Sequence, residues 1–406
     1  MQDVLIEKPY KFVPPLEQAW PAKMALWLGI HKWLLRTQEG IIDCEVRNAD
    51  RLEKSVAAGH GVMLTPNHPR TSDPMVMCSV IAETGIPFYT MASWHLFNQN
   101  ARTTFGIRMM GAFSVNREGL DKASVDYAVE TLQHAKRPLL IFPEGTTSLT
   151  NDKLMALMDG PSFIARTAAK RRGKKDGGKV VVHPVGIRYL FQGDLDRTCE
   201  GVLSDIERKL TWRPSPDAPL VDRIVKIGDA VLRLKEIQYD FIPDSSLTLK
   251  ERQNTLVDRL LHPLEEEWAG EHSDAGIAIR IKNLRMKIFP ELSRKTLPPK
   301  EQKRRWRQLE DTYLAQQIDC YPEQYLTEHP SVDRILETVE KFEEDLNDVS
   351  RLKRKLKVIV DIDEAIEVSG KRDRGAKTDA LMDQIRERLE TKMAQLQTES
   401  RMYEKL

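Results

Sequence analysis

Between residues 37 and 200, hydrophobic and polar positions follow two alternating patterns. Short apolar runs predict buried strands, and longer stretches with apolar residues three and four positions apart predict helices. The expected strands are 41–46, 61–65, 86–91, 112–116, 138–142 and 179–187. The expected helices are 50–58, 74–84, 95–108, 121–136 and 152–172. Strands separated by helices favour an α/β fold of three layers, with a largely parallel sheet flanked by helices.

The pattern changes after about residue 200, where strand signals largely vanish and prolines cluster at 214–219. Helical periodicity follows at 221–237, 247–269, 275–288, 299–318 and 331–357. In the last of these stretches apolar residues recur at alternating spacings of three and four, which is typical of a heptad seam. The seam consists of Val332, Ile335, Val339, Phe342, Leu346, Val349 and Leu356. Such a seam suits an antiparallel helical hairpin or a homodimer contact through the helical region.

The N-terminal segment 1–36 contains one predicted amphipathic helix, from Trp20 to Arg36. One face is expected to carry the apolar residues, opposite a basic pair, Lys32 and Arg36. The shared apolar face is Met24, Trp27, Leu28, Leu34 and Leu35. Three tryptophans beside cations suit a helix lying among lipid headgroups. The alternatives are an amphipathic helix packed on its own domain and a dimer contact.

Composition narrows the classes of function. A chain of 406 residues allows two or three domains. Its 62 lysines and arginines nearly balance 61 acidic residues, so global charge predicts no nucleic-acid partner. The four cysteines are far apart in sequence, which favours free thiols in a reducing compartment and no metal. Without a signal-like start or an apolar stretch of spanning length, we expect a cytoplasmic protein, peripheral to the inner face of a membrane.

The segment from Asn67 to Asp73 carries the most suggestive chemistry. It follows the apolar run 61–65 and precedes Pro74, so His68 is expected in a strand-to-helix loop and Asp73 at the N-cap of the helix. Open α/β sheets bind ligands at the carboxyl ends of their strands. A carboxylate behind an imidazole fixes its tautomer and suits a general base. A surface histidine beside a capping aspartate is the plainer alternative.

Three later stretches strengthen the catalytic interpretation. Gly111-Ala-Phe-Ser-Val-Asn-Arg117 is a strand-like run that ends in arginine, and Phe142-Pro-Glu-Gly-Thr146 follows another apolar run. Val181-Val-His-Pro-Val-Gly186 is a strand interrupted by proline, in which His183 is expected to be a packed or hydrogen-bonded core residue. The order and spacing of the four blocks resemble those of the glycerolipid acyltransferase family, which includes the 1-acylglycerol-3-phosphate acyltransferases.

The resemblance implies a role for each block. His68 and Asp73 would be catalytic, with His68 as the base. Arg117 would grip the acceptor's phosphate, with Gly111 in its lead-in, as guanidinium groups do in bidentate fashion. Glu144 would help to hold the acceptor or Arg117, and Gly145 and Thr146 would bind phosphate or the acceptor. Arg70 adds a cation for the acyl carrier or a second phosphate, and Pro184 would have no chemical role.

Family domains of this kind also close with a strand and a helix, which the apolar run 356–362 and the pattern 377–397 supply. The expected organisation is therefore an acyltransferase domain at 37–200, a helical insertion at 201–350 and a return to that domain at 351–406. A separate C-terminal domain is the alternative for the last part.

The expected reaction moves a fatty acyl group from acyl-CoA or acyl-ACP to a hydroxyl of a phosphate-bearing glycerolipid. Lysophosphatidic acid is the first acceptor to consider, followed by glycerol 3-phosphate or another lysophospholipid. The thioester is a co-substrate, and no cofactor is expected. The alternatives are an inactive lipid-surface or scaffold protein that works through its helical region, and a thioesterase that uses the same histidine with water.

Overall fold

The computed structural model describes residues 8, 10–117, 119, 121–174, 178–210, 212–244, 246–293, 297–320, 330–347, 350, 352, 354–372, 375 and 378–404. The chain divides into two compact units. One contains Gln2–Leu190 and Leu356–Glu399, and the other consists mainly of Phe191–Lys355 and Ser400–Leu406. The first is an α/β unit and the second is helical.

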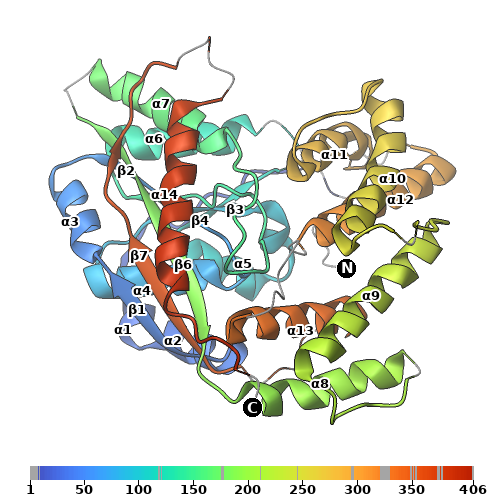
Figure 1. Cartoon of the computed structure of the whole chain (residues 1–406). Helices are drawn as coiled ribbons and strands as arrows, with labels where there is room; N and C mark the ends of the chain where they lie inside the picture. Colours follow the sequence, from blue (N-terminus) through green and yellow to red (C-terminus); the bar gives the residue numbers. More distant parts are fainter. Residues whose placement is uncertain are drawn as a thin grey trace. The chain divides into compact units, whose positions relative to one another are not determined.

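The α/β unit is built on a mixed, mostly parallel sheet, which has eight strands among the described residues (Figure 1). The order is β1-β7-β6-β2-β5-β3-β4, and β8 pairs with β6. The bounds are β1 Ile41–Arg47, β2 Gly61–Pro66, β3 Tyr89–Ser93, β4 Ala112–Val115, β5 Leu139–Leu140, β6 Val180–Phe191, β7 Leu356–Ile362 and β8 Ile366–Glu367. The strand from the far end of the sequence, β7, thus lies inside the sheet.

Helices cover both faces of this sheet, which confirms the predicted three layers (Figure 1). On one side α1 and α2 pack on α4, which contacts β1 and β7 together with α3. On the other side α6 and α7 pack together over β2, and α14 packs on α7. The bounds are α1 Trp20–Trp27, α2 Ile30–Gln38, α3 Ala49–Ala57, α4 Asp73–Thr84, α6 Lys122–His134, α7 Gly160–Gly173 and α14 Ala380–Gln397.

The central strands are apolar because they are covered on both faces. Every residue of β2 and β6 is buried, which explains why their sequences are mostly apolar and do not alternate with polar residues. Val182 and Met63 belong to one core cluster with Leu132 of α6 and Leu389 of α14. The burial of these strands fixes where their carboxyl ends place the loops that follow.

The predicted helix from Trp20 to Arg36 is wrong as a single element. It breaks into α1 and α2 at Gly29, whose φ of 70° is left-handed, a conformation that glycine adopts without steric cost. Leu35 consequently lies on the buried face and not with the exposed apolar residues. The exposed ones are Trp20, Met24, Trp27, Leu28, Ile30 and Trp33.

Two other predicted helices differ in the structure: one is divided and one begins later. The expected helix 95–108 is divided into η1 (Trp94–Asn98) and α5 (Ala101–Met109), because the side chain of Asn100 accepts a hydrogen bond from the Thr103 backbone and caps a new helix. The expected helix 152–172 begins only at Gly160. Residues 152–159 are irregular there.

The helical unit contains α8 Leu195–Lys209, α9 Leu220–Gln238, α10 Leu249–Ala269, α11 Ile277–Ser293, α12 Pro299–Asp319 and α13 Val332–Asn347. The sequence pattern did not predict α8, and it extended α13 too far. Leu356, expected to end the heptad seam, begins β7, and Val349 lies outside the described residues. The buried part of the seam faces α8 and α9 of the same chain.

No helix among the described residues is long and apolar enough to cross a membrane.

Candidate active site

The turn between β2 and α4 brings His68 and Asp73 together. Asp73 Oδ2 lies 2.7 Å from His68 Nδ1. The N-cap of α4 is Ser72, not Asp73 as predicted, and Asp73 is the first helical residue. Its carboxylate therefore faces the loop, where its Oδ2 also accepts the Arg70 backbone N–H at 2.9 Å.

The carboxylate sets the tautomer of the imidazole. A carboxylate oxygen accepts hydrogen bonds, so Nδ1 carries the proton and Nε2 keeps the lone pair. The side chain of Asp73 has no exposed surface, whereas that of His68 retains 15% exposure. The ring of His68 is stacked on Phe142 with centroids 4.0 Å apart. His68 is thus oriented on two sides and still reaches the surface.

The loop after β5 holds the backbone of His68 from both ends of the residue. Glu144 Oε1 accepts the His68 N–H at 2.6 Å, and the Ser148 N–H donates to the His68 carbonyl oxygen at 2.9 Å. Glu144 belongs to the third sequence block, which is far from His68 in sequence but contacts it in the fold. The base is therefore fixed by a segment almost eighty residues away in sequence.

Glu144 lies differently from its predicted position at the acceptor. It has no exposed surface, and its other oxygen, Oε2, accepts the Met155 backbone N–H at 2.7 Å. Burial raises the pKa of Glu144 to about 7, although the two backbone donors oppose that shift. This carboxylate holds two backbone segments together, at His68 and at Met155.

Arg117 reaches the same loop from the end of β4. Its Nη1 donates to the Gly145 carbonyl oxygen at 2.5 Å, and its side chain is half-buried. Asp121 links the residues on either side of Arg117, because its Oδ2 accepts the Asn116 N–H and its Oδ1 accepts the Ser124 N–H. His95 of η1 lies close by, and burial together with the Arg117 charge lowers its pKa to about 4. Arg117 therefore carries the positive charge at this place, and His95 is neutral at neutral pH.

The remaining predicted substrate residues divide into two groups. Gly145, with a φ of 68°, and the half-buried Thr146 lie in the loop that holds His68, and the Arg70 guanidinium lies 5.1 Å above the ring of Tyr189. Gly111 is not at the site. It precedes β4, at the opposite end from Arg117, and a Cβ there would lie 2.4 Å from the Phe88 carbonyl oxygen.

Several buried polar residues around the site were not predicted. Asn67 exchanges two hydrogen bonds with the backbone of Ile187 (3.0 and 2.7 Å), and Asn151 exchanges two with that of Tyr189 (both 2.8 Å). The Tyr189 hydroxyl donates to Asp73 Oδ1 at 2.5 Å. For Asn67 the available signal was a polar residue at the end of the apolar run 61–65, which is common in loops.

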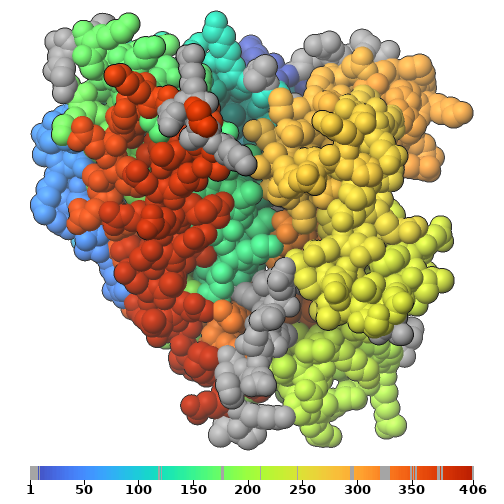
Figure 2. Space-filling model, turned by 45° about the horizontal axis from the view of Figure 1, so that its top comes forward, coloured from blue at the N-terminus to red at the C-terminus, as the bar shows by residue number. Residues whose placement is uncertain are grey.

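Helix α14 supports the site loop from outside. Arg386 Nη2 donates to the Met155 carbonyl oxygen at 3.2 Å, so Glu144 and α14 hold the two ends of the same peptide region. Figure 2 shows this helix exposed on the surface of the molecule beside the segment that follows β5. The late return of the chain to the α/β unit therefore contributes to the order of the site.

Other chemically suggestive groups are structural. His183 is buried, with Nε2 2.9 Å from Ser55 Oγ and Nδ1 2.8 Å from the Asp363 carbonyl oxygen, which confirms the predicted core histidine. Burial raises the pKa of the free Cys78 thiol to about 12, which does not suit a nucleophile. Within the described part of the chain, no group of three or more histidine, cysteine or acidic residues is arranged to hold a metal.

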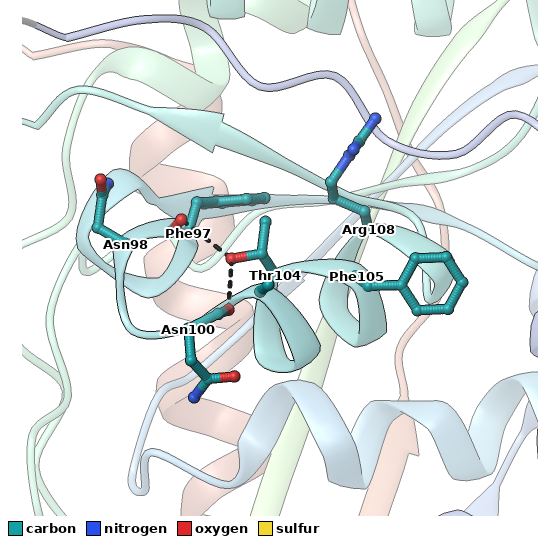
Figure 3. A pocket seen from close by; sticks show the side chains of 7 residues that line it. Phe97, Asn98, Asn100, Thr104, Phe105 and Arg108 are labelled. Atoms are coloured by element: carbon teal, nitrogen blue, oxygen red, sulfur yellow. Dashed lines mark hydrogen bonds between the residues drawn. The ribbon is translucent and has the colours of Figure 1, made fainter.

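A pocket of about 390 Å³ opens at η1 and α5 (Figure 3). Thr104 Oγ1 donates to the carbonyl oxygens of Phe97 (3.0 Å) and Asn100 (2.9 Å) at its centre. In the close-up, Phe105 and Arg108 point away from this centre. None of its lining residues is one of the predicted site residues.

The part of the chain that carries this site resembles a known protein family. Residues 43–188 match the family model described as Acyltransferase. That segment runs from β1 to β6 and includes the β2–α4 turn, the end of β4 and the loop after β5. A search of curated proteins finds no match.

Proposed function

Because residues 43–188 form an acyltransferase domain of the 1-acylglycerol-3-phosphate acyltransferase-like family, we propose the following reaction. The protein transfers a fatty acyl group from an acyl thioester, acyl-CoA or acyl-ACP, to the hydroxyl of a phosphate-bearing glycerolipid. Lysophosphatidic acid is the first acceptor to test. The observation that carries the proposal is the convergence of the His68–Asp73 pair and Arg117 on one loop.

The chemistry needs one base and no side-chain nucleophile. His68 Nε2 takes the proton of the acceptor hydroxyl as its oxygen attacks the thioester carbonyl. The C–O bond forms, the C–S bond breaks, and the departing thiolate takes a proton from the imidazolium. Asp73 stabilises that imidazolium and keeps the ring in the required tautomer. The thioester is already activated, so holding both substrates in place is sufficient.

Arg117 is suited to anchor the acceptor. Its Nη1 already reaches the loop after β5 at the Gly145 carbonyl oxygen, and a guanidinium can bind a phosphate in bidentate fashion. The low pKa of His95 keeps that neighbour neutral at neutral pH, so it does not add repulsion beside Arg117. An acceptor phosphate bound there would have its glycerol portion near the loop that carries His68.

We also propose that the protein binds peripherally to the cytoplasmic face of a membrane through α1 and α2. The exposed fractions of Trp27 (84%), Trp20 (65%) and Trp33 (63%) are large for tryptophan. Lys23 and Lys32 are exposed on the same helices. Exposed tryptophans beside cations are typical of helices in the headgroup region. A glycerolipid acceptor would be reached from that surface.

The test is thiol release from an acyl thioester by the purified full chain, with each candidate acceptor supplied in phospholipid vesicles. Wild type should release thiol only when an acceptor is present, and His68→Ala should abolish that release. His134→Ala removes an exposed histidine from the end of α6 and should leave the rate unchanged. Release of free acid without acceptor would indicate a thioesterase, and vesicle binding without turnover would indicate a scaffold protein.

A further inference from the structure

Asp73 is held on the side opposite His68 by a residue outside the four sequence blocks. The Tyr189 hydroxyl, on β6, donates to Asp73 Oδ1 at 2.5 Å, while Oδ2 accepts from His68 and from the Arg70 backbone. The Tyr189 side chain is 1% exposed, so water does not compete for this bond. Both oxygens of the carboxylate are therefore satisfied by fixed donors.

The direction of this hydrogen bond is fixed by its surroundings. Burial and the neighbouring Asp73 charge raise the pKa of Tyr189 well above its usual value, so the phenol keeps its proton and donates. Ser72 Oγ lies 3.2 Å from the same phenol oxygen. Because the phenol proton goes to Asp73, the Ser72 hydroxyl is the donor of that second bond.

We propose that Tyr189 is a positioning residue that acts through Asp73 on the catalytic imidazole. This inference rests on the proposed function. The Tyr189 hydroxyl, which donates to Oδ1, fixes the plane of the Asp73 carboxylate. It also draws part of the negative charge of that carboxylate away from Oδ2. The carboxylate then orients His68 without binding the imidazolium so tightly that the ring cannot release its proton to the leaving thiolate.

The effect on proton uptake follows from the charges around the pair. Asp73 of α4 faces His68, the Tyr189 hydroxyl of β6 and Glu144 of the loop after β5, whose charge interacts with it. The Arg70 guanidinium lies over the Tyr189 ring. Without the Tyr189 hydroxyl, Asp73 Oδ1 is a buried anionic oxygen that has lost a hydrogen-bond donor. The negative charge of Asp73 then stabilises the protonated form of His68 more strongly than in wild type. The pair should then take up its proton at higher pH.

The substitution that isolates the hydroxyl is Tyr189→Phe. It keeps the ring beneath Arg70, so KM for the acceptor should change less than twofold. We expect kcat to fall about tenfold, from loss of one hydrogen bond to a charged group. The acid limb of the pH–kcat profile should move to higher pH by about half a unit. Glu144 is present in both proteins, so its own titration cancels in the comparison.

A matched control and a milder variant complete the design. Tyr127→Phe removes a phenol that packs on Phe113 in the core of the same unit, with ring centroids 4.9 Å apart, and should change neither kcat nor the profile. Ser72→Ala removes the donor to the Tyr189 oxygen and should move the profile in the same direction by less. If Tyr189→Phe does not fold, Ser72→Ala alone decides, and an unmoved profile there overturns the proposal.

The results distinguish failure of this inference from failure of the proposed function. A wild-type protein with no acceptor-dependent thiol release contradicts the proposed function. In that case NMR titration of the His68 ring in wild type and Tyr189→Phe still tests the role of Tyr189, with His68→Ala used to assign the signal. An active wild type with an unchanged profile and kcat in Tyr189→Phe overturns the role of Tyr189. So does a loss of activity without a shift of the profile, which would show a purely structural role.

Discussion

Glu144 makes a quantitative prediction, because its environment opposes its charge. Burial raises its pKa from 4.5 to about 7. The folded chain therefore holds a proton that the unfolded chain releases between these two values. Stability from this group is fully present below about pH 4.5 and is lost as pH rises through about 7. The shift corresponds to about 3 kcal/mol of unfolding free energy.

The substitution to make is Glu144→Gln, because an amide resembles the protonated acid and cannot ionise. The amide loses one backbone hydrogen bond, which lowers the stability of the variant by the same amount at every pH. Relative to wild type, the stability of the variant should therefore rise by up to about 3 kcal/mol between pH 5 and pH 8. Urea unfolding at both pH values measures this difference, with the comparison between the two proteins removing the contribution of other groups.

Activity should change in the opposite direction. The carboxylate accepts N–H groups from both His68 and Met155, whereas an amide has only one accepting oxygen and turns an N–H toward the other donor. One hold on the backbone of the base is lost, and kcat should fall about tenfold. Asp379→Asn is the control of opposite sign. Burial would raise the pKa of Asp379, but its bonds with Arg166 and the Leu381 N–H hold it below the usual value, so this variant should lose stability at high pH.

An equal difference in stability between Glu144→Gln and wild type at pH 5 and pH 8 would contradict a raised pKa of Glu144.

The remaining predictions concern the acceptor, the membrane and the fold. Arg117→Gln should raise KM for a phosphate-bearing acceptor about tenfold or more, with little change in KM for the thioester in steady-state kinetics. Replacing Trp27 and Trp33 by serine should reduce vesicle flotation at least tenfold without changing turnover of a water-soluble acceptor. Gly111→Ala should lower the free energy of unfolding by about 2 kcal/mol or more, because φ is 92° and the new Cβ would meet the Phe88 carbonyl oxygen. Unchanged values would contradict each point.

The architecture was predictable where a local pattern coincided with burial. Strands β2 and β6 are buried throughout and mostly apolar because both faces are covered. The His68–Asp73 pair meets across a turn in which the two residues are five positions apart. The position of β7 between β1 and β6 was harder to predict. It depends on a strand after residue 355 pairing with strands that lie before residue 200.

The errors arose where side chains compete with the helix backbone. Residues 152–159 have a helical pattern, yet the Asp152 carboxylate pairs with buried Arg188 at 2.6 Å and the Met155 N–H bonds Glu144. These tertiary bonds replace a helix that the sequence alone favours. The break at Gly29 shows the same limit, because a glycine is compatible with both a continuous helix and a left-handed turn.

The candidate site shows a similar division between local and distant contacts. The turn of His68 and the end of β4 were accessible because their residues lie together in sequence. The roles of Glu144 and Tyr189 were not, because each acts through one oxygen that reaches a partner more than seventy residues away. The burial of Glu144 and its bond to the His68 N–H indicate that it supports the base.

The most direct test of the account is a double-substitution cycle on acceptor-dependent thiol release. His68→Ala and Asp73→Asn should each reduce kcat by about a thousandfold or more, while the thermal transition changes by a few degrees. Because the two side chains act as one unit, the double variant should be about as slow as the slower single variant. Independent effects, with the two reductions multiplying, would contradict a histidine base that depends on its carboxylate.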